Sequence, residues 1–340
     1  MKPAGLHTGD RFRIQGGRRL EGVVEISGAK NAALPSLAAT LLTADECVVE
    51  NVPAIDDMVA MAEILRSLGA EIERDREQSD VYRVRAVSIT ETTAPTRLVM
   101  ALRASFLVMG ALLGRFGEAA CSPPGGDVLG QRPLDVHLAG FARLGATVTR
   151  EGDKFVARAR QLRGARVFMD YPSVLGTENI LLAAVLARGT TEIVNAAAEP
   201  EIVDLAAMLN DMGARISGAG HHTITVEGVE ALHGTRHAVI PDRIEAGTFA
   251  LAVAAAGGEV DIRHAVPEHL VALRCKLEET GVHWLETEHG LRITREGRLR
   301  PTQIQAVPYP GLATDLQAPM SVVLTQADGV SFVHERVYDN

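Results

Sequence analysis

Two kinds of apolar pattern alternate along the chain. The first is an amphipathic helix that ends in glycine and runs into an alternating strand. It occurs four times, with its glycines at Gly69, Gly145, Gly213 and Gly281, which are 76, 68 and 68 residues apart. A glycine after a helix supplies the positive φ that ends it, and strict apolar–polar alternation is typical of a half-buried strand. We therefore predict a repeated unit of about 70 residues.

The second pattern is a helix of small apolar residues with almost no polar face. It occurs at residues 31–45, 103–117, 177–189, 245–258 and 316–329. Each of these stretches is followed by a short β-rich run. A helix that is apolar all round belongs in a core. The pattern predicts an α/β fold in which each unit runs helix, strand, helix, strand and further strand, with the apolar helices buried.

The two ends of the chain interrupt this repeat. Residues 11–26 contain two strand-like runs around Gly16 and Gly17. After the β-rich run 330–338 the repeat requires another helix, but the sequence ends at Asn340. We expect a truncated chain rather than a natural protein of four and a half units. Polar composition places hinges near Ser27 and His237.

Composition narrows the class of protein. The chain has 340 residues, is 46% hydrophobic and can bury the cores of about two domains. Its net charge of −9 and its aromatic content of 4% exclude a dominant nucleic-acid surface. Three widely spaced cysteines indicate reduced thiols, and no cysteine or histidine spacing predicts a metal site. No apolar run has the length of a signal peptide or a membrane span, so we expect a soluble cytoplasmic protein without membrane association.

One loop carries candidate chemistry. Residues 122–136 read SPPGGDVLGQRPLDV, a stretch rich in turn-forming residues with one acid, Asp127, and one guanidinium, Arg132. Such a loop is either an ordinary surface connection or a mobile segment that closes over an anionic substrate.

Six separate stretches carry a family resemblance. They read SGAKNAALP, LRASFLVMGALLGRFG, PGGDVLGQRPLDVH, NAAAEPEIVD, PDRIEAGTF and ATDLQAP. Together they resemble the UDP-N-acetylglucosamine 1-carboxyvinyltransferases, a family of enolpyruvyl transferases, from about Asp10 to Asn340. The sister family, the 3-phosphoshikimate 1-carboxyvinyltransferases, shares the fold but resembles the loop and SGAKNAALP less closely.

The resemblance implies an inside-out α/β barrel of six repeat units in two domains, with the active site between them. Residues 27–237 would form an inserted domain of three units. Residues 1–26 plus 238–340 would form a second, incomplete domain. Because cationic ligands of the family lie beyond Asn340, the resemblance implies little or no activity for these 340 residues alone.

The implied reaction moves the enolpyruvyl group of phosphoenolpyruvate to the 3′-hydroxyl of UDP-N-acetylglucosamine and releases phosphate, without a cofactor. It is the first committed step of peptidoglycan synthesis, and so serves cell-wall growth, cell shape and cell division. A related enzyme that uses shikimate phosphate, and a non-catalytic paralogue that only binds a nucleotide sugar, are the alternatives.

The resemblance assigns substrate contacts to residues that also have ordinary structural explanations. Lys30 and Asn31 lie at a strand-to-helix junction, where free N–H groups attract anions, but a helix cap with an extended lysine would look the same. Arg103, at the head of an apolar helix, would hold phosphoenolpyruvate or would simply be solvated. Arg132 would grip phosphate. The remaining substrate contacts implied by the resemblance are Pro133, Leu134, Asp135, Val136, Tyr171, Pro172, Ser173, Val174 and Val337.

Two acids are the implied catalytic residues. Asp315 corresponds to the base that faces the sugar hydroxyl, although an aspartate before an apolar helix is also a common N-cap. Asp127 replaces the cysteine that most members use as a proton donor and that fosfomycin alkylates. A carboxylic acid can still donate a proton, but a carboxylate is a poor nucleophile toward an epoxide. The sequence therefore predicts an enzyme that fosfomycin does not inhibit. Asp242 and Glu245 are expected to serve the hinge or a structural salt bridge.

Overall fold

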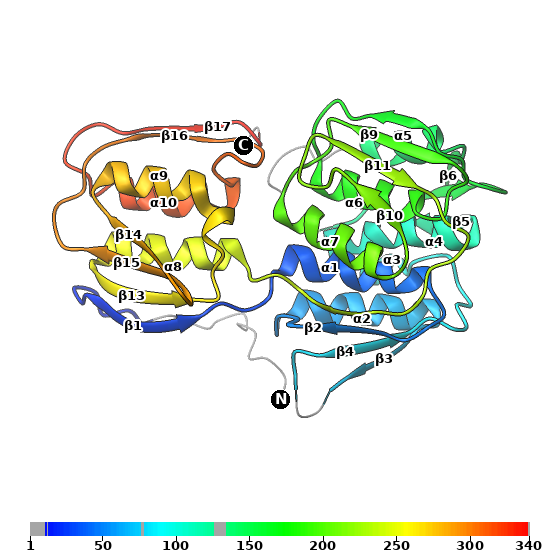
Figure 1. Cartoon of the computed structure of the whole chain (residues 1–340), viewed down its shortest axis with the longest axis horizontal. Coiled ribbons are helices and arrows are strands. Elements are labelled where there is room, and N and C mark those ends of the chain that lie inside the picture. Colours follow the sequence, from blue (N-terminus) through cyan, green and yellow to red (C-terminus); the bar gives the residue numbers. More distant parts are fainter. Residues whose placement is uncertain (1–10, 12, 76–77, 126–133, 339–340) are drawn as a thin grey trace. The chain divides into compact units, whose positions relative to one another are not determined.

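The computed structural model describes residue 11 and residues 13–75, 78–125 and 134–338. The chain divides into two compact units. Unit 2 is Lys30–Ile240, and unit 1 combines Met1–Ala29 with Pro241–Asn340. Both units are mixed α/β structures, as the sequence predicts (Figure 1).

Unit 2 contains three rounds of the repeat. Its helices are α1 (Lys30–Ala39), η1 (Thr40–Leu42), α2 (Asp56–Leu68), α3 (Thr96–Val99), η2 (Arg103–Leu107), α4 (Val108–Phe116), α5 (Asp135–Arg143), α6 (Val174–Ala184) and α7 (Pro200–Asp211), where η marks a 3-10 helix. Its strands are β2 (Cys47–Glu50), β3 (Glu71–Arg74), β4 (Tyr82–Arg85), β5 (Glu118–Cys121), β6 (Thr147–Glu151), β7 (Lys154–Arg158), β8 (Arg166–Phe168), β9 (Thr190–Val194), β10 (Arg215–Ser217), β11 (Thr223–Glu227) and β12 (Arg236–Ala238).

Unit 1 continues the same succession of elements. Its helices are α8 (Arg243–Ala256), η3 (Pro267–Leu270), α9 (Val271–Thr280), η4 (Thr314–Leu316) and α10 (Gln317–Leu324). Its strands are β1 (Leu20–Glu25), β13 (Gly258–Arg263), β14 (His283–Thr287), β15 (Gly290–Arg295), β16 (Gln303–Ala306) and β17 (Phe332–Glu335). The first of the two strand-like runs expected around Gly16 is wrong, because residues 13–19 form no strand.

The sheets of unit 2 exchange strands in a ring. In each sheet, the strand after a buried helix pairs antiparallel with another strand of its own repeat: β2 with β4, β5 with β7, and β9 with β11. The same strand pairs parallel with a segment from another repeat. β12 lies beside β2, β8 lies beside β9, and Thr93 forms a parallel bridge with Ala120 of β5. Each repeat thus completes the sheet of the next one, and the third repeat completes the sheet of the first.

The predicted glycine stops are confirmed. Gly69, Gly145, Gly213 and Gly281 have φ values of 109°, 93°, 99° and 93°. Each lies between a helix and a strand of the repeat, where a residue with a side chain would be strained. The positions of these four turns could therefore be predicted from the sequence, because the need for a positive φ depends only on the residues next to the turn.

The apolar helices are buried in unit 2, as expected. Residues 32–39 of α1, 108–113 of α4 and 176–184 of α6 are all buried, and the three sheets lie around these helices (Figure 1). The helices approach closely: a Cβ on Gly110 of α4 would stand 2.3 Å from the carbonyl oxygen of Asn179 on α6. Burial is less complete in unit 1, where Val322 of α10 is 59% exposed.

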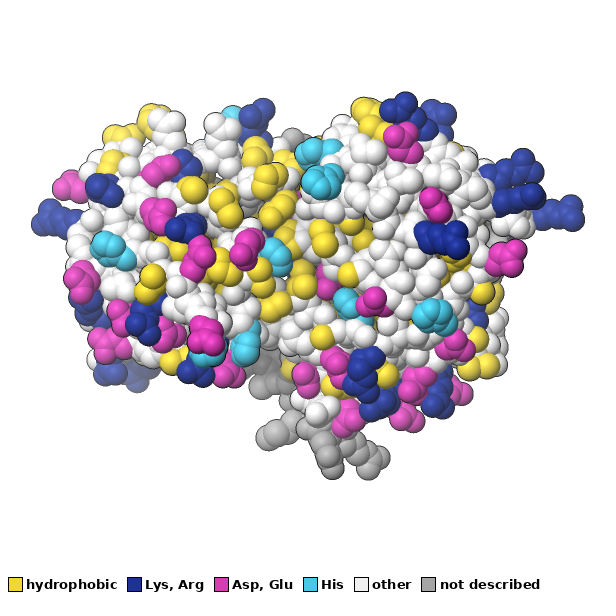
Figure 2. All heavy atoms as spheres, viewed as in Figure 1, with side chains coloured by type: hydrophobic (Ala, Val, Ile, Leu, Met, Phe, Trp, Pro, Cys, Tyr) yellow, Lys and Arg dark blue, Asp and Glu magenta, His cyan; other side chains and the backbone are white. Residues whose placement is uncertain are grey.

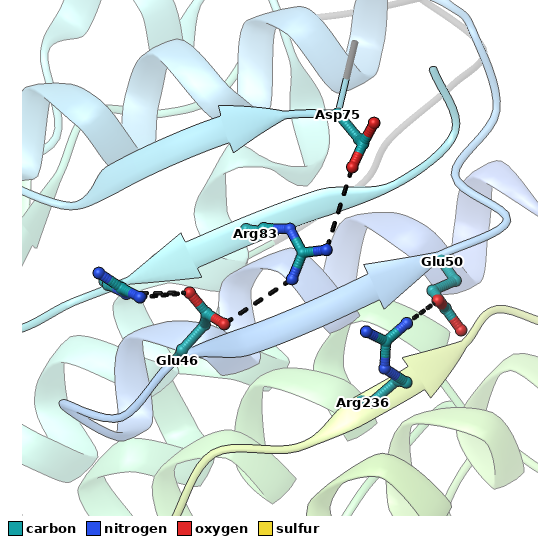
Figure 3. A network of polar contacts seen from close by, with 6 residues as sticks. Glu46, Glu50, Asp75, Arg83 and Arg236 are labelled. Atoms are coloured by element: carbon teal, nitrogen blue, oxygen red, sulfur yellow. Dashed lines mark hydrogen bonds and ion pairs between the residues drawn. The ribbon is translucent and has the colours of Figure 1, made fainter. Parts of the chain in front are cut away.

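Several ion pairs lie on the outer face of the sheet formed by β12, β2, β4 and β3 (Figure 3). Arg83 of β4 lies 3.8 Å from Glu46 and 4.0 Å from Asp75. Arg236 of β12 pairs with Glu50 of β2, across the junction that closes the ring. Exposed pairs contribute little stability, so we assign them to strand register rather than to folding energy.

Acidic and basic side chains are interspersed over the visible face of the molecule (Figure 2). Within the described residues, no helix combines the length and the apolar composition that crossing a membrane requires.

Candidate functional site

A small cavity in unit 2 gathers several predicted substrate residues. Arg103 begins η2, Leu134 directly precedes α5, and Leu175 lies in the first turn of α6. The cavity is lined by Arg103, Phe106, Leu107, Pro124, Leu134, His137 and Leu175. Its volume is about 10 Å³, close to the space that one water-sized group needs. The fold thus brings Arg103 to the two stretches expected to contact the nucleotide.

The first of these stretches approaches the start of α6, which directly follows the second stretch. Ser173 caps α6, because its side chain accepts a hydrogen bond of 3.1 Å from the backbone N–H of Gly176. Gly176 has no side chain, and a Cβ there would stand 2.8 Å from Cγ1 of Val136. Tyr171 is 42% exposed, so it is accessible to a ligand. Val136 therefore lies against the first turns of α6, the helix that Ser173 caps and at whose N-terminus N–H groups favour an anion.

A buried amide organises the wall of the cavity. Asn179 Oδ1 accepts a hydrogen bond of 2.7 Å from the backbone N–H of Gly110. Its Nδ2 lies 2.9 Å from the carbonyl oxygen of Phe106 and 3.0 Å from Nδ1 of His137. His137 is 3% exposed, and its ring meets the edge of Phe106 at a centroid distance of 5.2 Å. Burial and the nearby charge of Arg103 lower the pKa of His137 to about 4.

Sequence reasoning missed both His137 and Asn179. His137 is the last residue of the quoted loop motif and follows the predicted nucleotide segment directly, which was the available signal. Asn179 carries no such signal, because its partners are 42 and 73 residues away along the chain.

Lys30 and Asn31 are the first two residues of α1 and are both exposed. The Lys30 ammonium lies 3.7 Å from Oδ2 of Asp57, with 46% of the lysine side chain exposed. An exposed pair of this length is weak and can rearrange around a ligand. Both residues are therefore accessible at a helix N-terminus, as the sequence predicts, while their role stays a prediction.

Asp315 lies in unit 1, and its expected alternative role as a helix cap is wrong. It lies inside η4, and α10 begins after Leu316 without a side-chain cap. Its neighbour Thr314 donates a hydrogen bond of 2.8 Å to Oε2 of Glu335. Oε1 of the same carboxylate accepts a hydrogen bond of 2.6 Å from the backbone N–H of Val337. One unpredicted acid, Glu335, therefore ties together the two stretches that carry Asp315 and Val337.

Three predicted residues, Asp127, Arg132 and Pro133, lie outside the described residues. The two residues expected at the hinge have structural contacts within unit 1. Asp242 caps α8 by accepting hydrogen bonds from the N–H groups of Ile244 and Glu245. Glu245 in turn accepts from the N–H and the hydroxyl of Ser27, at 2.9 and 2.6 Å.

A buried carboxyl group in α6 is unexpected. Glu178 is fully buried, and neither of its oxygens has a hydrogen-bond partner among the described residues. Burial raises its pKa well above the usual range, and the charges of Glu201 and Glu199 raise it further. Burial therefore favours the neutral acid over the carboxylate at this position.

Comparisons with known proteins agree with this arrangement. The profile of the EPSP synthase (3-phosphoshikimate 1-carboxyvinyltransferase) family matches residues 14–340. The chain is 46% identical over 330 residues to UDP-N-acetylglucosamine 1-carboxyvinyltransferase 1 of Caldanaerobacter subterraneus subsp. tengcongensis. It is 48% identical over 332 residues to UDP-N-acetylglucosamine 1-carboxyvinyltransferase of Gluconacetobacter diazotrophicus. Each alignment covers 97% of this chain and 79% of the relative.

Solved structures share the fold. The enolpyruvyl transferase NikO from Streptomyces tendae superposes with a TM-score of 0.82 at 24% identity, over 95% of this chain and 76% of NikO. An EPSP synthase from Acinetobacter baumannii superposes with a TM-score of 0.67 at 17% identity, over 94% of this chain and 74% of that protein. At these identities the likeness concerns the fold alone. With the sequence relatives, it shows that the chain belongs to the UDP-N-acetylglucosamine 1-carboxyvinyltransferase family of enolpyruvyl transferases.

Proposed function

We propose that the protein transfers the enolpyruvyl group of phosphoenolpyruvate to the 3′-hydroxyl of UDP-N-acetylglucosamine and releases phosphate. The observation that carries this proposal is the identity of 46–48% to relatives of that name, spread over 97% of the chain. The reaction would commit the sugar to peptidoglycan and so support cell-wall growth and division. Because both substrates are charged cytoplasmic metabolites, we place it in the cytoplasm.

The chemistry assigns a role to each group. A bond forms between the sugar oxygen and C2 of phosphoenolpyruvate, and the bond from C2 to the phosphate oxygen breaks. Asp315 takes the hydroxyl proton, and Asp127 supplies the proton that C3 gains during the addition. When phosphate leaves, C3 returns a proton to the carboxylate of Asp127, which restores the double bond, and the hydroxyl proton leaves with the phosphate. Arginine and lysine suit the anionic groups, so Arg103, Arg132 and Lys30 bind phosphate or carboxylate.

The remaining predicted residues would hold the nucleotide sugar. Their support is that Leu134, and Leu175 directly after the second stretch, line the cavity that Arg103 also lines. Asn31 would act at the start of α1. Val337 would act with Asp315, because Glu335 links the two stretches that carry them. We also propose that residues 27–237 form one domain and that residues 1–26 and 238–340 form the other.

A second acceptor deserves a direct test, because the matching family profile is that of EPSP synthase. Phosphate release should be measured with phosphoenolpyruvate and either UDP-N-acetylglucosamine or 3-phosphoshikimate as acceptor. Between the two acceptors, we expect the nucleotide sugar and not 3-phosphoshikimate to support release. Release only with shikimate phosphate would overturn the proposal. Calorimetric binding of the nucleotide sugar without phosphate release would favour a non-catalytic nucleotide-sugar-binding protein instead.

A further inference from the structure

Three exposed arginines of unit 2 meet where three segments of the chain run side by side. The backbone N–H of Arg163 donates a hydrogen bond of 2.9 Å to the carbonyl oxygen of Leu144. Leu144 directly follows Arg143, the last residue of α5. On its other side, Arg163 forms a parallel bridge with Arg188. We call Arg143, Arg163 and Arg188 the arginine cluster.

The backbone holds two of these arginines directly opposite each other. The N–H of Arg188 donates to the carbonyl oxygen of Leu162, and the N–H of Gly164 donates to the carbonyl oxygen of Arg188, both at 2.9 Å. These two bonds fix Arg163 opposite Arg188 in the bridge. Like charges opposite each other destabilise a sheet, so this pairing is unfavourable unless negative charge lies nearby.

The described part of the chain supplies no such charge. None of the three arginines forms an ion pair there, although other exposed arginines of unit 2 do. Arg85 lies 2.8 Å from Glu46, and Arg166 lies 3.0 Å from Glu192. Glu230 is an exposed acid on an adjoining segment, and it forms no ion pair with the cluster. The repulsion within the cluster is therefore left without a partner from these residues.

The ends of the helices account for only one member of the cluster. Arg143 lies in the last turn of α5, where free carbonyl groups favour a cation. That effect fades beyond the last turn of a helix. Arg188 lies beyond the end of α6 at Ala184, and Arg163 belongs to no helix. The pair of Arg163 and Arg188 breaks a local rule without a gain in stability, which is a mark of functional sites.

We propose that the arginine cluster is an anion site that binds the diphosphate group of a small molecule. Guanidinium groups bind phosphate oxygens through paired hydrogen bonds, and a diphosphate carries enough charge to offset several neighbouring cations. The net charge of −9 opposes the approach of a long polyanion, so we assign a small ligand.

This site is separate from the Arg103 cavity. Leu175, which lines that cavity, lies in the first turn of α6, whereas Arg188 lies beyond the other end of the helix. The 11 residues of α6 span about 16 Å. The inference therefore does not depend on the proposed reaction.

The first experiment is backbone-amide NMR of the 15N-labelled protein during titration with inorganic pyrophosphate at low ionic strength. We expect the amide signals of Gly164 and Gly189, which adjoin the cluster, to shift. Binding in the Arg103 cavity would instead shift the signals of Leu134 and Leu175. The absence of any shift at Gly164 and Gly189 at millimolar pyrophosphate would overturn the inference.

A double variant tests whether the arginines themselves bind the anion. Arg163→Gln combined with Arg188→Gln should raise the half-saturating concentration of pyrophosphate about 10-fold or more, because charge-assisted hydrogen bonds are lost. The control combines Arg97→Gln with Arg215→Gln, which removes two exposed arginines elsewhere in unit 2 and should leave binding unchanged. Equal affinity of the two double variants would reject the site.

A second arm of the titration uses ADP to identify the source of the diphosphate. Tighter binding of ADP than of pyrophosphate would support the site and assign it to a nucleotide. Equal or weaker binding of ADP would support recognition of the diphosphate group alone.

Thermal melting tests the repulsion from which the inference starts. Without an added anion and at low ionic strength, Arg188→Gln should melt at a higher temperature than the unaltered protein, and Arg97→Gln should not. Pyrophosphate should raise the melting temperature of the unaltered protein more than that of Arg188→Gln, since a ligand stabilises the state that binds it. If Arg188→Gln melts no higher than the unaltered protein, the repulsion is absent and the inference fails.

Discussion

Thr314 donates a hydrogen bond of 2.8 Å to Glu335, which fastens the turn containing Asp315 to strand β17. The other oxygen of Glu335 accepts from the backbone of Val337 at 2.6 Å. The two bonded segments lie more than 20 residues apart in sequence, since Thr314 and Glu335 are separated by 21 positions. The carboxylate therefore sets the relative position of two stretches to which we assign substrate contacts.

Glu335→Ala should lower kcat/KM for phosphate release about 10- to 100-fold, because the turn that carries the proposed base loses its anchor. Glu335→Gln should retain most of the activity, since its amide oxygen can accept from Val337 and its nitrogen can donate to the Thr314 hydroxyl. Thermal melting of both variants checks that they fold. Equal losses in the two variants would show that the charge of Glu335 matters rather than its anchoring bonds.

His137 should make the stability of unit 2 depend on pH. The unfolded imidazole binds a proton below about pH 6.5, but the folded one does so only below about pH 4. Since the unfolded state binds more protons in that window, stability is full above pH 6.5 and falls as the pH is lowered toward 4. By pH 5 the loss is about 2 kcal/mol from this group.

Urea unfolding at pH 7.5 and pH 5.0 measures this dependence. Carboxylates also titrate toward pH 5. The change in the free energy of unfolding between the two pH values is therefore compared between the unaltered protein and His137→Gln, whose side chain cannot be protonated. We expect that variant to lose less stability than the unaltered protein between the two pH values. Identical losses of stability in the two proteins would contradict the lowered pKa of His137.

Glu178→Gln should stabilise the protein, and more at high pH than at low pH. The folded pKa of Glu178 is raised by burial and by two neighbouring acids. Its contribution to stability is therefore fully present below the unfolded pKa of about 4.3 and is lost as the pH rises toward the folded pKa. The glutamine side chain has nearly the same shape as the glutamate side chain, but it cannot ionise and so carries no charge that burial would disfavour.

The measurement is the melting temperature at pH 5 and pH 8. We expect the gain of Glu178→Gln to be larger at pH 8. Glu192→Gln is the control, because the side chain of Glu192 is 42% exposed and pairs with Arg166. A gain of Glu178→Gln that does not change with pH would mean that ionisation of Glu178 is not what the substitution relieves.

Gly110→Ala should destabilise unit 2 by about 1–3 kcal/mol or more, because overpacking at a close helix contact forces backbone shifts. The added Cβ would meet the Asn179 carbonyl oxygen at 2.3 Å and its Oδ1 at 2.4 Å. Gly297→Ala is a matched control with no atom within 4 Å of the new methyl group. Denaturant unfolding of both proteins distinguishes the packing effect from the general effect of replacing glycine.

Asp127→Cys should make the enzyme sensitive to fosfomycin, while the unaltered protein should resist it. The reason is chemical: a thiolate opens an epoxide readily and a carboxylate does not. The measurement is time-dependent loss of phosphate release, with mass spectrometry to find the adduct. Inhibition of the unaltered protein at the same rate would contradict the assignment of Asp127 to the loop position that most relatives fill with cysteine.

Sequence reasoning succeeded where the physical requirement is local. The four positive-φ glycines and the buried character of α1, α4 and α6 follow from residues within one turn or one helix. It failed where side chains act across long separations. The cap that was the alternative for Asp315 did not form because a 3-10 turn encloses it. The links made by Asn179 and Glu335 join residues 42 and 21 positions apart in the sequence. The family resemblance named Arg103 and Leu134 but not Leu175, and no periodicity in the sequence predicts that the three residues line one cavity.

The ring of exchanged strands has a kinetic consequence. β12 completes the sheet that β2 begins, so its partner pair joins His237 to Val49 across most of unit 2. Closing so long a loop is entropically costly, and pairings of that kind slow folding. During synthesis, the first repeat must wait with an open β2 edge until β12 has left the ribosome. Chaperone dependence should therefore be greatest in the interval before residue 238 emerges, and should end abruptly once it has.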